Sequence, residues 1–266
     1  MKKVLLFLLA AMMLLSVTAC GSGNSDNSST TGTETTGTDD ASAGKVYMIA
    51  TDTTFAPFEF ENDEGNMVGI DLDLLAAIAE DQGFEYKLQA VGFSAAVTSL
   101  EAGESDAVIA GMSITDERKE KYDFSDPYYD SGVGMGVLKD SGITSYEDLR
   151  GKQVAAKMGT EGNSFAESIQ EEYGFTIVQF EDSSTMYQDV LSEASVACFE
   201  DYPVLGYEIS RGLEMTLPLD MEKGNSYGFA VMKDENQDLL EMFNKGLENL
   251  KSSGKYDEIL NTYISK

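Results

Sequence analysis

The 266-residue sequence contains no histidine at all and only two cysteines. Without histidine, the Ser-His and Cys-His pairs of nucleophilic enzymes and the usual zinc sites are excluded. Cys20 lies near the N-terminus, which leaves Cys198 alone in the rest of the chain and excludes an intrachain disulfide there. Cys198 lies in the apolar run 196–199, which predicts a buried structural thiol.

Basic residues are scarce too, with 18 Lys and Arg against 47 Asp and Glu, and the formal net charge is −29. A surface this acidic argues against nucleic acid and against anionic lipid as partners. Solubility is the simplest explanation of the charge, which says little about a small ligand.

A long hydrophobic run occurs near the N-terminus, where Lys2 and Lys3 precede apolar residues 4–15. A membrane-spanning helix needs about 20 apolar residues, so this run is typical of an export signal instead. Residues 17–20 (VTAC) resemble a bacterial lipobox, which implies cleavage before Cys20 and attachment of lipid to its thiol. We therefore predict a lipoprotein signal peptide at 1–19. An ordinary signal peptide with an incidental Cys20 is the alternative.

The segment after the signal, 21–44, contains only Gly, Ser, Thr, Asn, Asp, Glu and Ala. Because it has no residues that could form a core, we predict a lipid-anchored, disordered linker over 20–44. A flexible coil of this length has ends about 27 Å apart. The sequence thus predicts a domain held at the outer face of the cytoplasmic membrane, with the lipid as its only membrane contact.

Past the linker, short apolar runs alternate with amphipathic stretches, which indicates α/β architecture with mainly parallel sheets. One predicted helix carries Leu72, Leu75 and Ile78 and ends before Gly83. Strands are predicted at 46–50, 86–91, 107–110, 153–157, 177–180 and 196–199. Further helices are predicted at 94–102, with Ser94 as its cap, and at 164–173, 185–193, 239–252 and 256–263. Segment 123–136 separates two such series and is a candidate domain junction.

Ligands of parallel sheets bind beyond the carboxyl ends of the strands. The residues found there are 51–52, 110–113, 157–162 and 200–201. They include several charged and hydroxyl side chains, so these strand ends are the predicted site.

Four motifs resemble the amino-acid-binding proteins of bacterial ABC importers, in order and in spacing, and glutamine-binding proteins most closely. They are 50–60 (ATDTTFAPFEF), 69–74 (GIDLDL), 110–118 (AGMSITDER) and 123–129 (DFSDPYY). The resemblance covers 45–266 and implies a two-lobed periplasmic-binding-protein type II fold, with helices on a mainly parallel sheet in each lobe. It implies lobe 1 at 45–128 plus 228–266, lobe 2 at 129–227, and hinges near 128–132 and 223–227.

The resemblance also implies how the main-chain groups of an amino acid would be held. Arg118 corresponds to the family's carboxylate clamp, since a guanidinium matches a carboxylate at two points. Asp201 corresponds to the partner of the α-ammonium. The remaining residues at these positions supply donors or flank the ligand: Ala110, Gly111, Ser113, Thr160, Glu161, Phe55 and Phe93. From the residues alone, Arg118 could instead pair with Asp116 or Glu120 at the surface, Asp201 could cap a helix, and the phenylalanines could be core.

Side-chain selection would fall to Asp52, Lys157 and Glu200. Asp52 and Lys157 correspond to positions that read a side-chain amide. Glu200 departs from the family, because such proteins can carry histidine there, and the departure leaves the amino acid open. Lys157 disfavours a cationic ligand and the two carboxylates disfavour glutamate, so a polar, uncharged, glutamine-like amino acid is expected.

The expected function is non-catalytic: a monomeric receptor, without cofactor or metal, delivers an amino acid to an ABC permease and its ATPase. Two alternatives remain open. An exported prephenate-type dehydratase of the same fold could use Glu200 or Glu161 as general acid, and a sensory domain would report ligand occupancy to a membrane partner.

Overall fold

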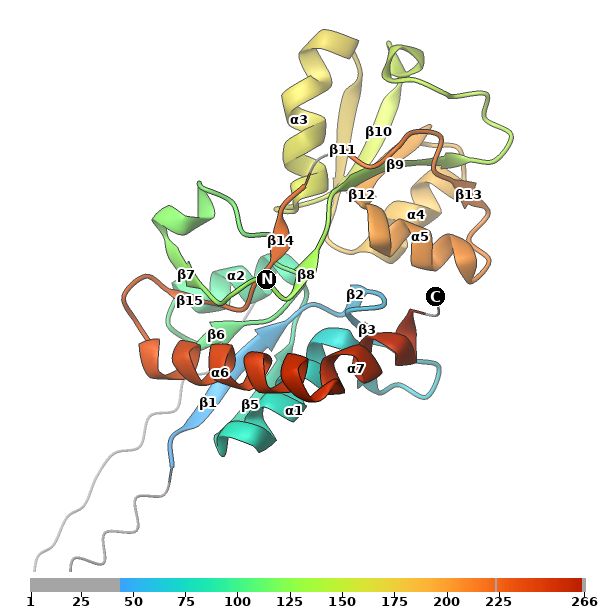
Figure 1. Ribbon diagram of the computed structural model, residues 1–266. Helices are drawn as coiled ribbons and strands as arrows, with labels where there is room; N and C mark the ends of the chain where they lie inside the picture. Colours follow the sequence, from blue (N-terminus) through green and yellow to red (C-terminus); the bar gives the residue numbers. More distant parts are fainter. Residues whose placement is uncertain (1–43, 223, 265–266) are drawn as a thin grey trace, which may run out of the picture. The chain divides into compact units, whose positions relative to one another are not determined.

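The computed structural model describes residues 44–222 and 224–264. Within them the chain forms two five-stranded sheets with helices against them, on two lobes (Figure 1). The predicted signal peptide, Cys20 and almost all of the predicted linker lie outside the described residues. None of the described helices is long and apolar enough to cross a membrane.

The first sheet has the strand order β5-β1-β6-β15-β7. Strand β1 runs parallel to both of its neighbours, β5 and β6, whereas β15 is antiparallel to its two neighbours. Its members are β1 (Val46–Thr51), β5 (Glu85–Ala90), β6 (Ala107–Val108), β7 (Tyr122–Phe124) and β15 (Ala230–Met232). The helices of this lobe are α1 (Ile70–Gln82), α2 (Phe93–Glu101), α6 (Gln237–Ser253) and α7 (Lys255–Tyr263).

The second sheet repeats this pattern with the order β11-β10-β12-β9-β13. Here β10 runs parallel to β11 and β12, and β9 is the reversed strand. Its members are β9 (Val133–Leu138), β10 (Gln153–Lys157), β11 (Thr176–Phe180), β12 (Ala197–Asp201) and β13 (Met215–Thr216). Its helices are α3 (Glu161–Tyr173), α4 (Ser183–Leu191) and α5 (Tyr202–Ser210), and short 3₁₀ turns occupy Arg118–Glu120 and Tyr146–Leu149.

A two-stranded antiparallel ribbon, β8 (Tyr129–Asp130) with β14 (Ser226–Tyr227), carries the chain between the lobes (Figure 1). In each sheet the reversed strand is the one that comes soon after this ribbon: β9 follows β8, and β15 follows β14. A small sheet of β2 (Thr54–Phe55), β3 (Glu59–Glu61) and β4 (Met67–Val68) lies between β1 and α1 in the chain. The predicted α/β, two-lobed fold is confirmed, and each sheet is mixed through its one reversed strand.

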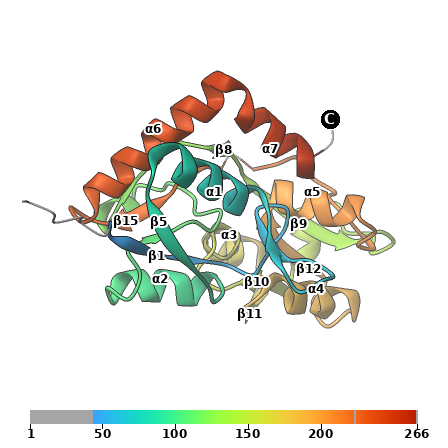
Figure 2. The same ribbon diagram turned by 90° about the horizontal axis from the view of Figure 1, so that it is seen from below.

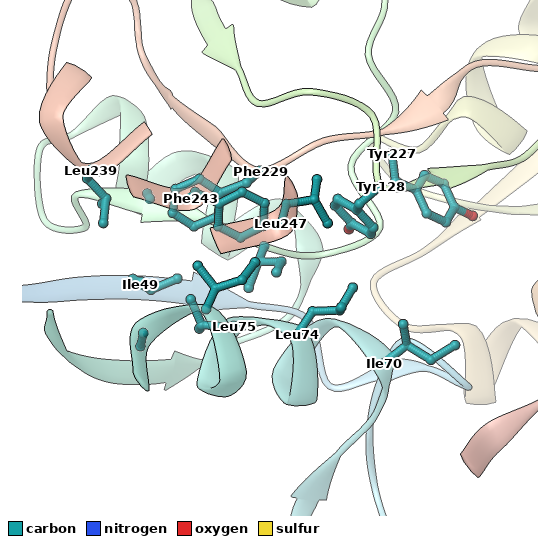
Figure 3. Close-up of a cluster of buried hydrophobic side chains, with 14 of the residues drawn as sticks. Ile49, Ile70, Leu74, Leu75, Tyr128, Tyr227, Phe229, Leu239, Phe243 and Leu247 are labelled. Atoms are coloured by element: carbon teal, nitrogen blue, oxygen red, sulfur yellow. The ribbon is translucent and has the colours of Figure 1, made fainter. Parts of the chain in front are cut away.

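The first lobe is held together by a core in which α1 packs beside α6, near β1 (Figures 2 and 3). Phe229 and Phe243 stack with their ring centroids 4.3 Å apart, and Leu75 and Leu247 lie in the same cluster. Burying one such side chain stabilises the fold by about 1.5–3 kcal/mol. Cys198 is fully buried in the second lobe, as predicted.

Element ends deviate from the predictions in ways that matter for the site. Helix α1 does end at Gly83, which adopts the left-handed conformation with φ 71°. Ser94, however, does not cap α2, because the helix begins one residue earlier, after Gly92. Helix α3 begins at Glu161, three residues before the prediction, with the Thr160 hydroxyl accepting the N–H of Asn163 as its cap.

Candidate functional site

A small, largely enclosed cavity lies between the two lobes. Ten side chains and backbone segments line it, all of them among the predicted site residues: Asp52, Phe55, Phe93, Ala110, Gly111, Ser113, Arg118, Thr160, Glu161 and Asp201. The remaining two predicted residues, Lys157 and Glu200, are fully buried just behind the wall.

Arg118 is held by backbone carbonyls from both lobes. Its Nη1 donates to the Ser113 carbonyl and its Nη2 to the Gly159 carbonyl, both at 2.9 Å. The guanidinium also lies 5.5 Å from the centre of the Phe93 ring, close enough for a cation–π contact. A surface pairing of Arg118 with Asp116 or Glu120 is therefore not what positions this side chain, and its positive charge is directed to the cavity.

Asp201 is the last residue of β12 and the N-cap position of α5, yet its side chain makes no capping hydrogen bond. Its Oδ1 instead accepts hydrogen bonds from the hydroxyls of Ser131 and Tyr227, each at 2.8 Å. Burial raises the pKa of Asp201 to about 6, although these hydrogen bonds and Arg118 act to lower it. The carboxylate is held in a fixed orientation and costs free energy until a cation neutralises it.

Gly111 forms a wall of the cavity where the first sheet's strand β6 has ended. It has φ 51°, and a Cβ added to it would lie 2.3 Å from Cε1 of Phe55. Only glycine therefore permits the Phe55 ring to lie against this backbone. The Gly111 N–H donates at 2.8 Å to Oδ2 of Asp71, which lies behind the wall.

The N-terminus of α3 supplies the opposite wall. The Thr160 hydroxyl donates to the Lys157 carbonyl at 2.7 Å and accepts from the Asn163 amide at 3.3 Å. A Cβ on Gly162 would lie 2.6 Å from the Phe199 carbonyl oxygen, so this glycine lets the helix start pack directly on β12. The unsatisfied N–H groups of a helix start favour an anion.

A buried charge network crosses between the lobes at the side of the cavity that Asp52 lines. Lys157, at the end of β10, pairs with Asp52, which follows β1, and both are essentially unexposed. Lys157 also donates to the hydroxyls of Ser183, at 3.3 Å, and Thr54, at 3.4 Å. Ser183 in turn donates to Oε2 of Glu200 at 2.8 Å. Burial raises the pKa of Glu200 to about 7, while Lys157 acts to lower it.

Four residues of these networks escaped the sequence analysis: Thr54, Ser131, Ser183 and Tyr227. All of them act through a hydroxyl, and two come from the ribbon region 129–131 and 226–227. Isolated hydroxyl residues carry no spacing pattern, so the sequence alone offered no signal for them. Thr54 reaches Lys157 from the other lobe, whereas Ser131 and Ser183 reach their partners through packing within the second lobe.

The lobes touch directly around the cavity. Besides the Asp52–Lys157 pair and the Arg118–Gly159 bond, the Ser94 hydroxyl donates to the Met158 carbonyl at 3.2 Å. This contact explains the role of Ser94, which the sequence analysis wrongly assigned as a helix cap.

The two lobes, the ribbon between them and the cavity where they meet define a periplasmic-binding-protein type II fold. The chain belongs to the bacterial extracellular solute-binding proteins, family 3, whose model matches residues 47–266. It is 32% identical to the arginine-binding extracellular protein ArtP of Bacillus subtilis (strain 168), over 97% of this chain and 96% of ArtP. Such relatives are binding proteins and not enzymes.

Two solved structures of amino-acid-binding proteins are similar to this chain, but they superpose on it to different extents. The second substrate-binding domain of GlnP from Lactococcus lactis, in an open conformation, is 43% identical, with a TM-score of 0.59. The match covers 83% of this chain and 96% of that domain. An ancestral arginine-binding protein bound to glutamine is 34% identical, with a TM-score of 0.77. That match covers 83% of this chain and 98% of the ancestral protein.

Proposed function

We propose that this protein captures a free polar amino acid, glutamine-like in its side chain, and delivers it to the membrane permease and ATPase of an ABC importer. The observation that carries this is the meeting of Arg118 and Asp201, from different lobes, on one enclosed cavity. A free amino acid bears a carboxylate and an ammonium on the same carbon. Both lose water on entering a closed cavity, so each needs a partner of opposite charge there.

In this proposal Arg118, Ser113 and the amides at the start of α3 bind the ligand carboxylate, while Asp201 binds the ammonium. Phe55 and Phe93 flank the ligand and exclude water. The hydroxyls of Ser131 and Tyr227 support this role of Asp201, because they fix its orientation without neutralising its charge.

The side-chain end of the cavity favours a ligand that is polar but uncharged. Asp52 and Lys157 neutralise each other there, and a guanidinium or ammonium side chain would have to compete with Lys157 for Asp52. An amide can accept from one of the two and donate to the other without separating the pair. Glu200 sits behind Lys157 and balances part of its charge.

Hinge closure is the proposed mechanism, with the ligand stabilising the state in which both lobes contact it. The comparison with known structures supports this. The more identical GlnP domain, in an open conformation, superposes less well than the ancestral protein bound to glutamine. A different angle between the lobes would account for that order. The proposed lobes are 45–128 plus 228–266 and 129–227, with the hinges at 128–132 and 223–227.

Export and anchoring complete the proposal. The signal at 1–19 and a lipid on Cys20, followed by the linker at 20–44, would hold the domain at the outer face of the cytoplasmic membrane, next to the permease. The dehydratase alternative is disfavoured by Asp201, since a substrate without an ammonium would leave that buried carboxylate unpaired. A sensory role would use the same ligand site and differ only in the partner.

Thermal shift against the twenty amino acids and prephenate tests the proposal. A ligand present at 100 times its Kd stabilises by about 2.7 kcal/mol, so we expect glutamine or a similar polar amino acid to raise Tm by several degrees. Arg118→Ala should abolish the shift while circular dichroism shows an unchanged fold. Lys119→Ala, an exposed neighbour, is the matched control. Stabilisation by prephenate alone, or an undiminished shift in Arg118→Ala, would contradict the proposal.

A further inference from the structure

Two carboxyl groups that the proposed binding mechanism does not use lie buried behind the cavity wall. Glu59, the first residue of β3, and Asp71, in the first turn of α1, are both completely inaccessible. Both oxygens of Glu59 and Oδ1 of Asp71 have no hydrogen-bond donor among the described residues. A buried carboxylate oxygen without a hydrogen-bond donor costs free energy. The protonation state of the two groups decides how large this cost is.

The two side chains are neighbours in this buried region, and each affects the pKa of the other. If both were ionised, their facing oxygens would repel one another in a buried region. If one carries a proton, a single O–H donor pairs an oxygen of Glu59 with the free Oδ1 of Asp71. One proton therefore removes the like-charge repulsion and satisfies otherwise orphaned atoms.

The surroundings decide which of the two holds the proton. Asp71 Oδ2 accepts the Gly111 amide at 2.8 Å and the Tyr128 hydroxyl at 2.7 Å, and it lies at a helix N-terminus, where negative charge is favoured. Glu59 has no such donors. Burial, together with the neighbouring carboxylates of Asp71 and Asp52, raises its pKa well above the ordinary value, and Lys157 only partly offsets this.

We infer that Glu59 is protonated at neutral pH and donates to Asp71, which stays ionised and thereby positions the binding site. The Asp71 carboxylate joins three parts of the molecule: the helix α1, the Gly111 wall of the cavity and Tyr128, the residue before the ribbon strand β8. Figure 3 shows Tyr128 beside Tyr227, whose hydroxyl holds Asp201. Glu59 and Asp71 are thus positioning residues that need not touch the ligand.

Glu59→Gln is the decisive variant, because its amide has the shape of a protonated carboxyl group and keeps a donor for Asp71. In the wild-type protein, folding takes up a proton at Glu59 as long as the folded group stays protonated. The unfolding equilibrium constant therefore rises with pH, by at most about tenfold per pH unit from this group alone. Glu59→Gln lacks this pH dependence, because its amide takes up no proton on folding. Urea unfolding without ligand at pH 6, 7 and 8 should therefore show that Glu59→Gln becomes more stable relative to the wild type as the pH rises. The ratio of the two unfolding equilibrium constants should change by up to about tenfold per pH unit.

Glu61→Gln, an exposed carboxylate on the same strand, is the matched control and should follow the wild-type pH curve. Parallel pH curves for Glu59→Gln and wild type would overturn the inference.

A second measurement concerns binding and rests on the proposed function. Asp71→Asn removes the charged acceptor of the Gly111 amide. Calorimetry should show that this variant binds the amino acid selected by the thermal-shift panel about tenfold more weakly than the wild type does. Glu59→Gln should stay within about threefold of wild type. If both variants lost the same amount of ligand affinity, the proposed positioning role of the Asp71 charge would be overturned. Because the unfolding experiment needs no ligand, failure of the proposed function would leave it unaffected.

Discussion

At the scale of single residues, the cavity is built from opposite charges whose orientation is set by neutral partners. Arg118 is held by two carbonyls and Asp201 by two hydroxyls. These partners are neutral, so they orient the charges without cancelling them. Pre-orientation of this kind lowers the entropy cost of binding.

The raised pKa of Asp201 gives binding a pH dependence. With a pKa of about 6 before binding, Asp201 is ionised at pH 7.5 and mostly protonated at pH 5. An ammonium needs the ionised form, so a bound proton must leave, and affinity should fall about tenfold between pH 7.5 and pH 5. Calorimetry at both pH values measures this.

Asp201→Asn controls for other titrating groups. It should bind more weakly at every pH and lose most of the pH effect. A wild-type affinity that is the same at pH 5 and pH 7.5 would exclude Asp201 as the ammonium partner.

At the scale of secondary-structure elements, the ribbon region depends on backbone segments that approach without side chains between them. A Cβ on Gly224 would lie 2.1 Å from the Gly132 Cα and 2.3 Å from the Ser131 carbonyl oxygen. Ser131 is also a donor to Asp201. The spacing of the two segments therefore affects both the connection between lobes and the site.

Gly224→Ala should force these segments apart. We expect a loss of about 1–3 kcal/mol, typical of overpacking, which is a Tm decrease of several degrees for a protein of this size. Differential scanning calorimetry measures it.

Gly206→Ala is the matched control, because Gly206 lies within α5 with nothing within 4 Å of its added Cβ. Alanine is the better helix former, so this variant should gain about 0.5–1 kcal/mol. Equal stability of the two variants would show that the segments separate without cost.

At the scale of the whole molecule, closure and binding should be coupled. Closing without a ligand would leave the charges of Arg118 and Asp201 in an enclosed space, away from water, which is unfavourable. We therefore expect an open arrangement in solution without ligand, and a smaller radius of gyration when a saturating amino acid is added.

Small-angle X-ray scattering with and without ligand measures this change. The radius of gyration of Arg118→Ala should not decrease when the same ligand concentration is added. An identical radius of gyration for the wild type in both conditions would contradict closure by the ligand.

The sequence by itself determined the α/β class, through its alternation of apolar runs and amphipathic stretches, and several element ends, such as Gly83 after α1. Through its motifs it also indicated the two-lobed fold and the residues that line the cavity. These are local signals, because strand ends and helix starts lie within a few residues of the side chains they position.

The tertiary structure alone decided the partners: Ser131 and Tyr227 on Asp201, Ser183 between Lys157 and Glu200, and Glu59 against Asp71. Some of these residues are far apart in the chain, and a single hydroxyl or carboxyl group has no periodicity that would single it out. Which of them meet, and which carboxyl group must carry a proton, depends on desolvation and on the packing of the elements within each lobe. Both arise only when the chain is folded.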